Sequence, residues 1–137
     1  LADIGRGLAG WALLTAILLA LGVAFHAYTP GDLWRAITGW TPRQRLLFFG
    51  IGLMAAFVEE SLFRGYLQPS LVRRLGTAGG IVASALLFTL YHIDFHPLSF
   101  ISKMATGLVL GAMAHGTRSL VSPAVAHALT WWVIGAF

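Results

Sequence analysis

An apolar stretch at residues 8–28 carries no formal charge, and it constrains this chain more than any other feature. At about 1.5 Å of rise per residue, a helix of about 21 residues spans the roughly 30 Å hydrocarbon core of a bilayer. A secretory signal peptide is the alternative, because Arg6 precedes the stretch. However, Thr29, Pro30 and Gly31 follow it as a turn without a small-residue cleavage pattern. We therefore predict a retained transmembrane helix.

The composition of the whole chain has the same character. Of its 137 residues, 58% are hydrophobic and 10% are charged, whereas a soluble domain has about 25% charged residues. So few charges argue against a disordered segment, a coiled coil and most cytosolic enzymes. The nine basic residues are scattered, so no nucleic-acid partner is expected. The chain has no cysteine, which excludes disulfides, thiolate metal sites and cysteine catalysis.

Four further apolar runs follow, at residues 46–67, 77–93, 98–115 and 120–137. Short connections predict antiparallel neighbours, and Gly107 and Gly111 form a GxxxG pattern that permits close helix packing. We predict an all-α polytopic membrane bundle of about five transmembrane helices, a single membrane domain with lipids as partners. Residues 1–45 would form the first transmembrane helix and an interfacial loop, and residues 46–137 a four-helix core.

Two adjacent carboxylates, Glu59 and Glu60, lie inside the second apolar run. An ionisable side chain in the middle of a membrane helix costs about 2.5–3.5 kcal/mol on insertion scales, so such residues find partners and serve a function. Glu60 and Arg64 are spaced i, i+4 and can form an ion pair on one face. Glu59 lies about 100° around the helix and should point elsewhere, free to act as a general base. The alternative is a purely structural polar knot made by the three residues.

Two histidines lie on other apolar runs. His92 ends the third run and His127 lies within the fifth. A lone histidine among apolar neighbours is more often a core residue than a catalyst, but two of them with a carboxylate on a third helix form a less ordinary set. If the three helices bundle, Glu59, His92 and His127 converge on one cavity. The remaining histidines are expected at interfacial positions near helix ends: His26, His96 and His115.

Metal binding and serine catalysis are the competing chemistries. Asp94 and His96 resemble a small ligand cluster beside His92, but a metal site needs three or four ligands with supporting partners. An HExxH pattern is absent. Ser61, beside Glu60, has neither a Ser-Lys nor a Gly-x-Ser-x-Gly context and is expected to be a small packing residue. We therefore expect no metal and no cofactor.

Three motifs in order carry a family resemblance: Glu59-Glu60-x-x-x-Arg64, then Phe88-x-x-x-His92, then His127 in a last apolar helix. This set resembles the CPBP family of CAAX prenyl-protease and bacteriocin-processing (Abi) membrane proteins, over roughly residues 46–134. The resemblance implies an all-helical intramembrane protease, with residues 46–137 as its catalytic core. It implies that Glu59 is the general base, that His92 helps it hold water and that His127 helps stabilise the oxyanion. Glu60, Arg64 and Phe88 would support the site.

One position departs from the family pattern. The last motif is usually HxxxN, and Trp131 stands where the family has Asn. An indole N–H can donate a hydrogen bond, but it is bulkier than an amide and placed differently. Losing one oxyanion donor typically costs about 10²–10³ in rate. The sequence therefore predicts a membrane-embedded peptidase with a weakened oxyanion hole.

Two functions follow from these residues. The first is an intramembrane glutamate-type endopeptidase that hydrolyses a peptide bond in a membrane-associated protein or peptide. The second is a catalytically weak or inactive CPBP-like subunit that packs with other membrane subunits in a larger complex. A protease needs Glu59, His92 and His127 around one water-accessible cavity, whereas a scaffold would have them sealed by Trp131 or a neighbouring chain. In either case we expect an integral protein of the plasma (inner) membrane of a bacterium.

Overall fold

The computed structural model describes residues 1–27 and 29–134, and its elements within those ranges are all helices. In chain order they are α1 (Ala2–Ala24), α2 (Pro30–Gly39), α3 (Pro42–Glu60), the π-helix η1 (Ser61–Leu67), α4 (Gln68–Tyr91), α5 (Pro97–Thr117) and α6 (Val121–Ile134). Three stretches are long and apolar enough to cross a membrane, namely Ala2–Ala24, Pro42–Tyr91 and Pro97–Thr117. The prediction of an all-α membrane bundle is confirmed.

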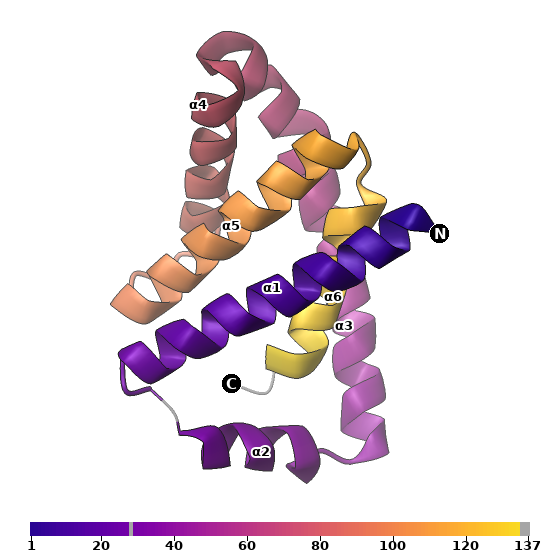
Figure 1. Cartoon of the computed structure of the whole chain (residues 1–137), viewed down its shortest axis with the longest axis vertical. Coiled ribbons are helices and arrows are strands. Elements are labelled where there is room, and N and C mark those ends of the chain that lie inside the picture. The colour runs from indigo at the N-terminus through magenta and orange to yellow at the C-terminus, as the bar shows by residue number, and fades with distance from the viewer. Residues whose placement is uncertain (28, 135–137) are drawn as a thin grey trace.

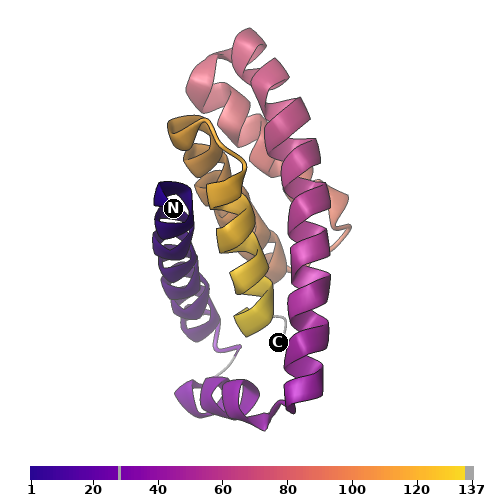
Figure 2. The ribbon, with the colours of Figure 1, turned by 90° about the vertical axis from the view of Figure 1, so that its right-hand side faces the viewer.

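The longest of these stretches, Pro42–Tyr91, folds back on itself and forms two helical segments of the bundle. Helix α3, η1 and the start of α4 form one continuous rod, and the chain reverses at Gly76, as the magenta and pink ribbon shows in Figure 2. Gly76 has φ 73° and ψ 171°, a conformation that glycine adopts readily and other residues rarely do. At Gly80 an added Cβ would lie 2.4 Å from the Val72 amide nitrogen. The two helical segments on either side of Gly76 therefore meet backbone to backbone.

The expected end of this helix at residue 67 is wrong, because the helix continues to Gly76. Pro69 is the second residue of α4, two positions after η1 ends at Leu67. The change from π to α hydrogen bonding already interrupts the regular backbone hydrogen bonds there. The lack of a proline N–H therefore costs little further helix stability.

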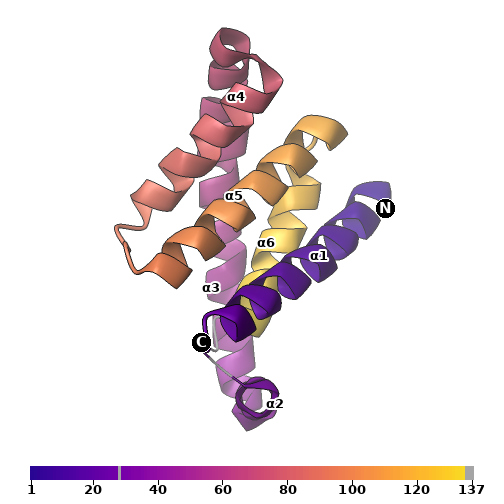
Figure 3. The ribbon, with the colours of Figure 1, turned by 60° about the vertical axis from the view of Figure 1, so that its left-hand side comes forward.

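The polar stretch after α1 is a second correction, since it contains a helix where a loop was expected. Helix α2 lies across one end of the bundle (Figures 1 and 3). It begins with a capping box in which Thr29 Oγ1 accepts from the Asp32 amide and the Asp32 carboxylate accepts from the Thr29 amide. Thr41 starts α3 in the same way. Trp34 is 69% exposed on α2, as expected for an interfacial segment.

Helix α1 packs against α5 and α6. It begins at Ala2 and ends at Ala24, earlier than expected at both ends, and Tyr28 lies outside the described residues. Leu14 of α1 is fully buried with Leu110 of α5 and Ala126 of α6. The N-terminal helix is therefore part of the bundle core.

The GxxxG pattern on α5 is a packing surface, as predicted. A Cβ added at Gly107 would lie 2.9 Å from both Cα and Cβ of Ala85 on α4. We expect Gly107→Ala to lower the free energy of unfolding by about 1–3 kcal/mol, because the clash meets backbone that has no room to move. Gly116→Ala is the matched control, since no atom lies within 4 Å of its added Cβ. It should leave the protein as stable as before or stabilise it. Equal loss in both variants would contradict close packing at Gly107.

Candidate functional site

The candidate site begins where α3 changes into η1. Glu59 and Glu60 are the last two residues of α3, and both are buried. Single π turns within longer helices occur frequently at functional sites. The irregular turn carries Arg64, which places a third ionisable side chain beside the two carboxylates.

Glu60 and Arg64 form the ion pair that their spacing predicted. Arg64 Nη1 lies 3.1 Å from Glu60 Oε1, and both side chains are 1% exposed. Arg64 Nη2 donates to the Gly107 carbonyl at 3.2 Å, and the guanidinium carbon lies 4.5 Å from the centroid of the Phe88 ring. The charge of Arg64 is therefore held by a carboxylate, a carbonyl and an aromatic face.

His127 joins the two carboxylates. Its Nδ1 lies 2.7 Å from Glu60 Oε1 and its Nε2 lies 3.7 Å from Glu59 Oε2. Glu59 was expected to point away from Glu60, and the structure adds a histidine that contacts both. The two carboxylates diverge around α3, but α6 places one imidazole between them, and its two nitrogens face opposite partners.

His92 completes the cluster from the end of α4. Its Nδ1 lies 2.8 Å from the Phe88 carbonyl oxygen, and its Nε2 lies 4.0 Å from Glu59 Oε2. Because a carbonyl only accepts hydrogen bonds, this contact assigns the proton to Nδ1. Nε2 of the neutral ring is then an acceptor that faces Glu59. The expected convergence of Glu59, His92 and His127 is present in the structure.

When both imidazole rings are neutral, the convergent atoms are all acceptors. The Glu60 carboxylate accepts from His127 Nδ1, so Nε2 of a neutral His127 is also a lone-pair acceptor. Glu59 Oε2 has no hydrogen-bond partner among the described residues. Three acceptors around one point need a donor between them, and a water molecule supplies two O–H groups. The His92 side chain is 21% exposed and that of Glu59 is 12% exposed, so the cluster opens on the His92 side.

Other predicted residues lie apart from this cluster. Trp131 is half-buried on α6, and its Cβ would lie 2.7 Å from a Cβ added at Gly52 of α3. Its ring carbon Cγ would lie 3.5 Å from the same added Cβ, so Trp131 packs the α3–α6 contact. Ser61 is exposed, which contradicts its expected packing role within this chain. As expected, His26, His96 and His115 are exposed at or next to helix ends.

Sequence reasoning missed Gln68. Its Nε2 donates to the Gly111 carbonyl at 2.9 Å, one turn beyond the bond from Arg64 to Gly107. The two bonds join η1 and the start of α4 to both glycines of the GxxxG pattern, which was expected to serve packing alone. The signal was present in the sequence, since Arg64 and Gln68 are spaced i, i+4 like Gly107 and Gly111.

The loop after His92 is fastened to α5 by one carboxylate. Asp94 accepts from the His96 amide at 3.1 Å and pairs with Lys103 at 3.1 Å, and the Ser99 hydroxyl also bonds to it. Among the residues that the structure describes, no group of three or more His, Asp or Glu side chains is placed to hold a metal ion. The contacts of Asp94 therefore join the loop to the start of α5 beside the site.

Acid is expected to release this loop. The bond from Ser99, with those from Lys103 and the His96 amide, lowers the pKa of Asp94 from 3.8 to about 2. A lowered pKa in the folded state stabilises that state above the unfolded value, and the effect disappears as pH falls through the folded value. We expect the parent to have a higher midpoint of thermal unfolding than Asp94→Asn at about pH 6. The difference should narrow between about pH 4 and about pH 2. A difference that does not change with pH would contradict this assignment.

Comparison with known proteins agrees with the motif pattern. Residues 41–133 match the family described as type II CAAX prenyl endopeptidase Rce1-like. The chain is 31% identical over 104 residues to the "Uncharacterized protein YpbD" of Bacillus subtilis (strain 168). That alignment covers 74% of this chain and 50% of the relative, so the chain spans about half the length of the curated relative that it matches. No solved structure matches the chain.

Proposed function

The chain belongs to the Rce1-like, CPBP-type family of CAAX prenyl endopeptidases, a family of membrane proteases, and from that premise we propose that it hydrolyses a peptide bond within the membrane. Its substrate would be a membrane-associated protein or peptide. Water would be activated by Glu59 together with His92. The bacterial relative supports a place in the plasma membrane of a bacterium.

The observation that carries this proposal is the set of three acceptors formed by Glu59 Oε2, His92 Nε2 and His127 Nε2. A water held there donates to Glu59, which removes a proton as the oxygen attacks the amide carbonyl carbon. The protonated Glu59 then gives that proton to the leaving amine nitrogen. Both steps use one carboxylate, because the second returns it to its starting state.

His127 is proposed to stabilise the oxyanion. In the neutral ring Nε2 is an acceptor, so His127 would take up one proton from solvent when the substrate binds and return it when the products leave. Nε2 would then donate to the oxyanion while Nδ1 keeps its proton toward Glu60. The Glu60 carboxylate would stabilise that positive charge, as a buried aspartate does for the histidine of a serine protease triad. Arg64 also pairs with Glu60, and the Phe88 ring lies against the Arg64 guanidinium. With Trp131 in place of the family's Asn, we propose a turnover about 10²–10³ lower than a second oxyanion donor would allow.

Comparing peptide termini in membranes tests the proposal. Cells that carry the parent would be compared with cells that carry Glu59→Gln, which keeps the size of the side chain but cannot act as a base. We expect some termini to be present only with the parent, and these would identify the substrate. Identical termini, with both forms equally abundant, would reject proteolysis.

A second candidate function is a structural subunit of a larger membrane complex. It is favoured by the bonds of Arg64 and Gln68 to the two glycine carbonyls, which tie helices together without any role in catalysis. The packing of Trp131 against Gly52 fits the same function. In that case, other membrane subunits should co-purify with the parent and with Glu59→Gln alike.

A further inference from the structure

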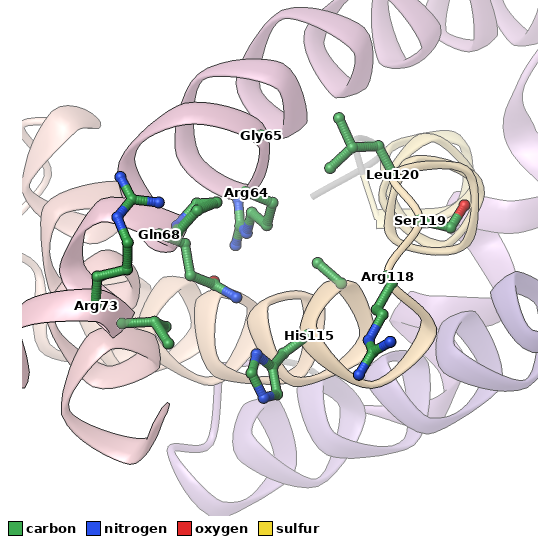
Figure 4. Close-up of a pocket in the computed structure, with 11 residues that line it drawn as sticks. Arg64, Gly65, Gln68, Arg73, His115, Arg118, Ser119 and Leu120 are labelled. Atoms are coloured by element: carbon green, nitrogen blue, oxygen red, sulfur yellow. The ribbon is translucent and has the colours of Figure 1, made fainter. Parts of the chain in front are cut away.

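A groove separate from the Glu59 cluster lies between three segments: η1 with the start of α4, the end of α5, and the turn at residues 118–120 that precedes α6 (Figure 4). Its volume is about 540 Å³. Apolar side chains from all three segments line it, namely Pro69, Val72, Ala114 and Leu120. Its lining also includes Arg64, which therefore contacts both the groove and, through Glu60, the Glu59 cluster.

Basic side chains surround the groove. Arg73, His115 and Arg118 line it and are exposed. Within the described part of the chain, no carboxylate pairs with Arg73 or Arg118, and Arg73 donates only to the Ser70 hydroxyl, at 2.9 Å. Asp3 approaches the nearby Ser122 but is itself paired with Arg6 at 3.0 Å. Neither Arg73 nor Arg118 therefore has an ion-pair partner among the described carboxylates.

Beneath the inner wall of the groove, against Gly111, lies an unused acceptor. Gln68 is 3% exposed, and its Nε2 is bonded to the Gly111 carbonyl. Its Oε1 is buried and has no hydrogen-bond partner among the described residues. An unpaired buried amide oxygen costs about 1–3 kcal/mol, so a ligand that donates a hydrogen bond there would be favoured. Figure 4 shows Gln68 between Arg73 and Arg64, with the end of its side chain at α5.

The groove lies where the chain turns. Arg73 precedes the reversal at Gly76, and Arg118 is the left-handed residue that ends α5. In a polytopic bundle such turns lie at the level of the lipid headgroups, where basic residues meet anionic lipids. Helix α2, with the exposed Trp34, lies at the other end of the bundle (Figure 1).

From these observations we propose that the groove binds one anionic phospholipid with a hydroxylated headgroup, such as phosphatidylglycerol. Its phosphate would lie between Arg73 and Arg118, and a headgroup hydroxyl would donate to Gln68 Oε1. An acyl chain would cover the apolar wall made by Val72 and Leu120. Free phosphate satisfies the arginines alone, whereas a lipid matches the charge, the acceptor and the apolar wall together. This binding site is distinct from Glu59 and does not depend on peptide hydrolysis.

Native mass spectrometry of the full chain tests the proposal. The protein would be released from micelles that contain equal amounts of phosphatidylglycerol and phosphatidylcholine. The parent should retain one phosphatidylglycerol in preference to phosphatidylcholine. In the double variant Arg73→Gln/Arg118→Gln, we expect this preference to fall about 30-fold, the equivalent of about 1 kcal/mol per basic side chain. An unchanged preference would overturn the proposal.

Matched variants separate this site from a general effect of charge. Arg74→Gln removes the same charge from a neighbouring exposed position that does not line the groove, so it should keep the parent's preference. Leu120→Glu keeps both arginines but places a negative charge on the apolar wall, and it should lose the preference. Far-ultraviolet circular dichroism would establish that each variant is folded. An equal loss with Arg74→Gln would overturn the proposal, since general surface charge would then explain retention.

Two soluble competitors distinguish the source of the anionic group. Inorganic phosphate and glycerol phosphate would each be added at increasing concentration to the lipid-bound parent. We expect neither to displace the retained lipid, because neither covers the apolar wall. Displacement by inorganic phosphate at millimolar concentration would overturn the lipid assignment in favour of a simple anion site.

Discussion

Replacing Glu59 by glutamine is expected to lower the turnover of the purified protein by about 10²–10⁴-fold, the contribution typical of a positioned general base. The amide cannot take a proton from water. Its NH₂ group can instead donate to the acceptor nitrogens of His92 and His127, which now face Glu59 Oε2 at 4.0 and 3.7 Å. The free energy of unfolding should therefore stay the same or rise. Initial rates on the membrane substrate, with unfolding in mixed micelles, would measure both quantities.

The neighbouring carboxylate provides the matched control. Glu60→Gln makes the same chemical change one residue later, but it leaves the buried Arg64 without its counter-charge. We expect this variant to lose stability first and activity as a consequence. If Glu59→Gln lost stability while Glu60→Gln kept it, the assignment of catalysis to one carboxylate and support to the other would be reversed.

The second large effect concerns the ion pair itself. Arg64→Met should lower the free energy of unfolding by about 3–5 kcal/mol, because it leaves a buried carboxylate uncompensated. The same substitution also removes the bond to the Gly107 carbonyl and the contact with the Phe88 ring. Equilibrium unfolding with a denaturing detergent in mixed micelles, followed by circular dichroism, would measure the loss.

A double variant tests whether charge or packing causes that loss. Arg64→Met/Glu60→Gln removes both charges and keeps a hydrogen-bond acceptor for His127 Nδ1. Replacing both members of a buried pair is often close to neutral, so most of the stability should return. A double variant as unstable as the sum of the two single variants would show that the pair has no coupling.

The sequence predicted most of the helical architecture because hydrophobic runs and sparse charges leave few alternatives in a membrane. It did not predict α2, since Pro30 and Gly31 looked like a turn and the capping box of Thr29 and Asp32 went unrecognised. It also ended a helix at residue 67 that runs on to Gly76. A local π turn before Pro69 depends on hydrogen bonding that residue patterns do not reveal.

The sequence indicated which ionisable residues lie together in the structure, but not how they contact one another. The i, i+4 spacing was sufficient for the pair of Glu60 and Arg64. The contact of His127 with both carboxylates depends on how deeply α6 enters beside α3, which tertiary packing decides. Gln68 escaped notice because a single glutamine near a helix end has many ordinary explanations.

The partners of Glu60 and Arg64 lie far along the chain, so the ribosome makes them well after the two charged residues. Gly107 lies 43 residues after Arg64, and His127 lies 67 residues after Glu60. At about 5–20 residues per second, the ribosome needs about 3–13 s to deliver the histidine after the glutamate. For the first part of that interval, before Phe88 and Gly107 are made, the two charges lack the ring, the carbonyl and the imidazole that contact them in the folded protein. We therefore expect α3 to be released into lipid only after the later helices emerge, so that interrupting translation late should leave the two charges without these partners.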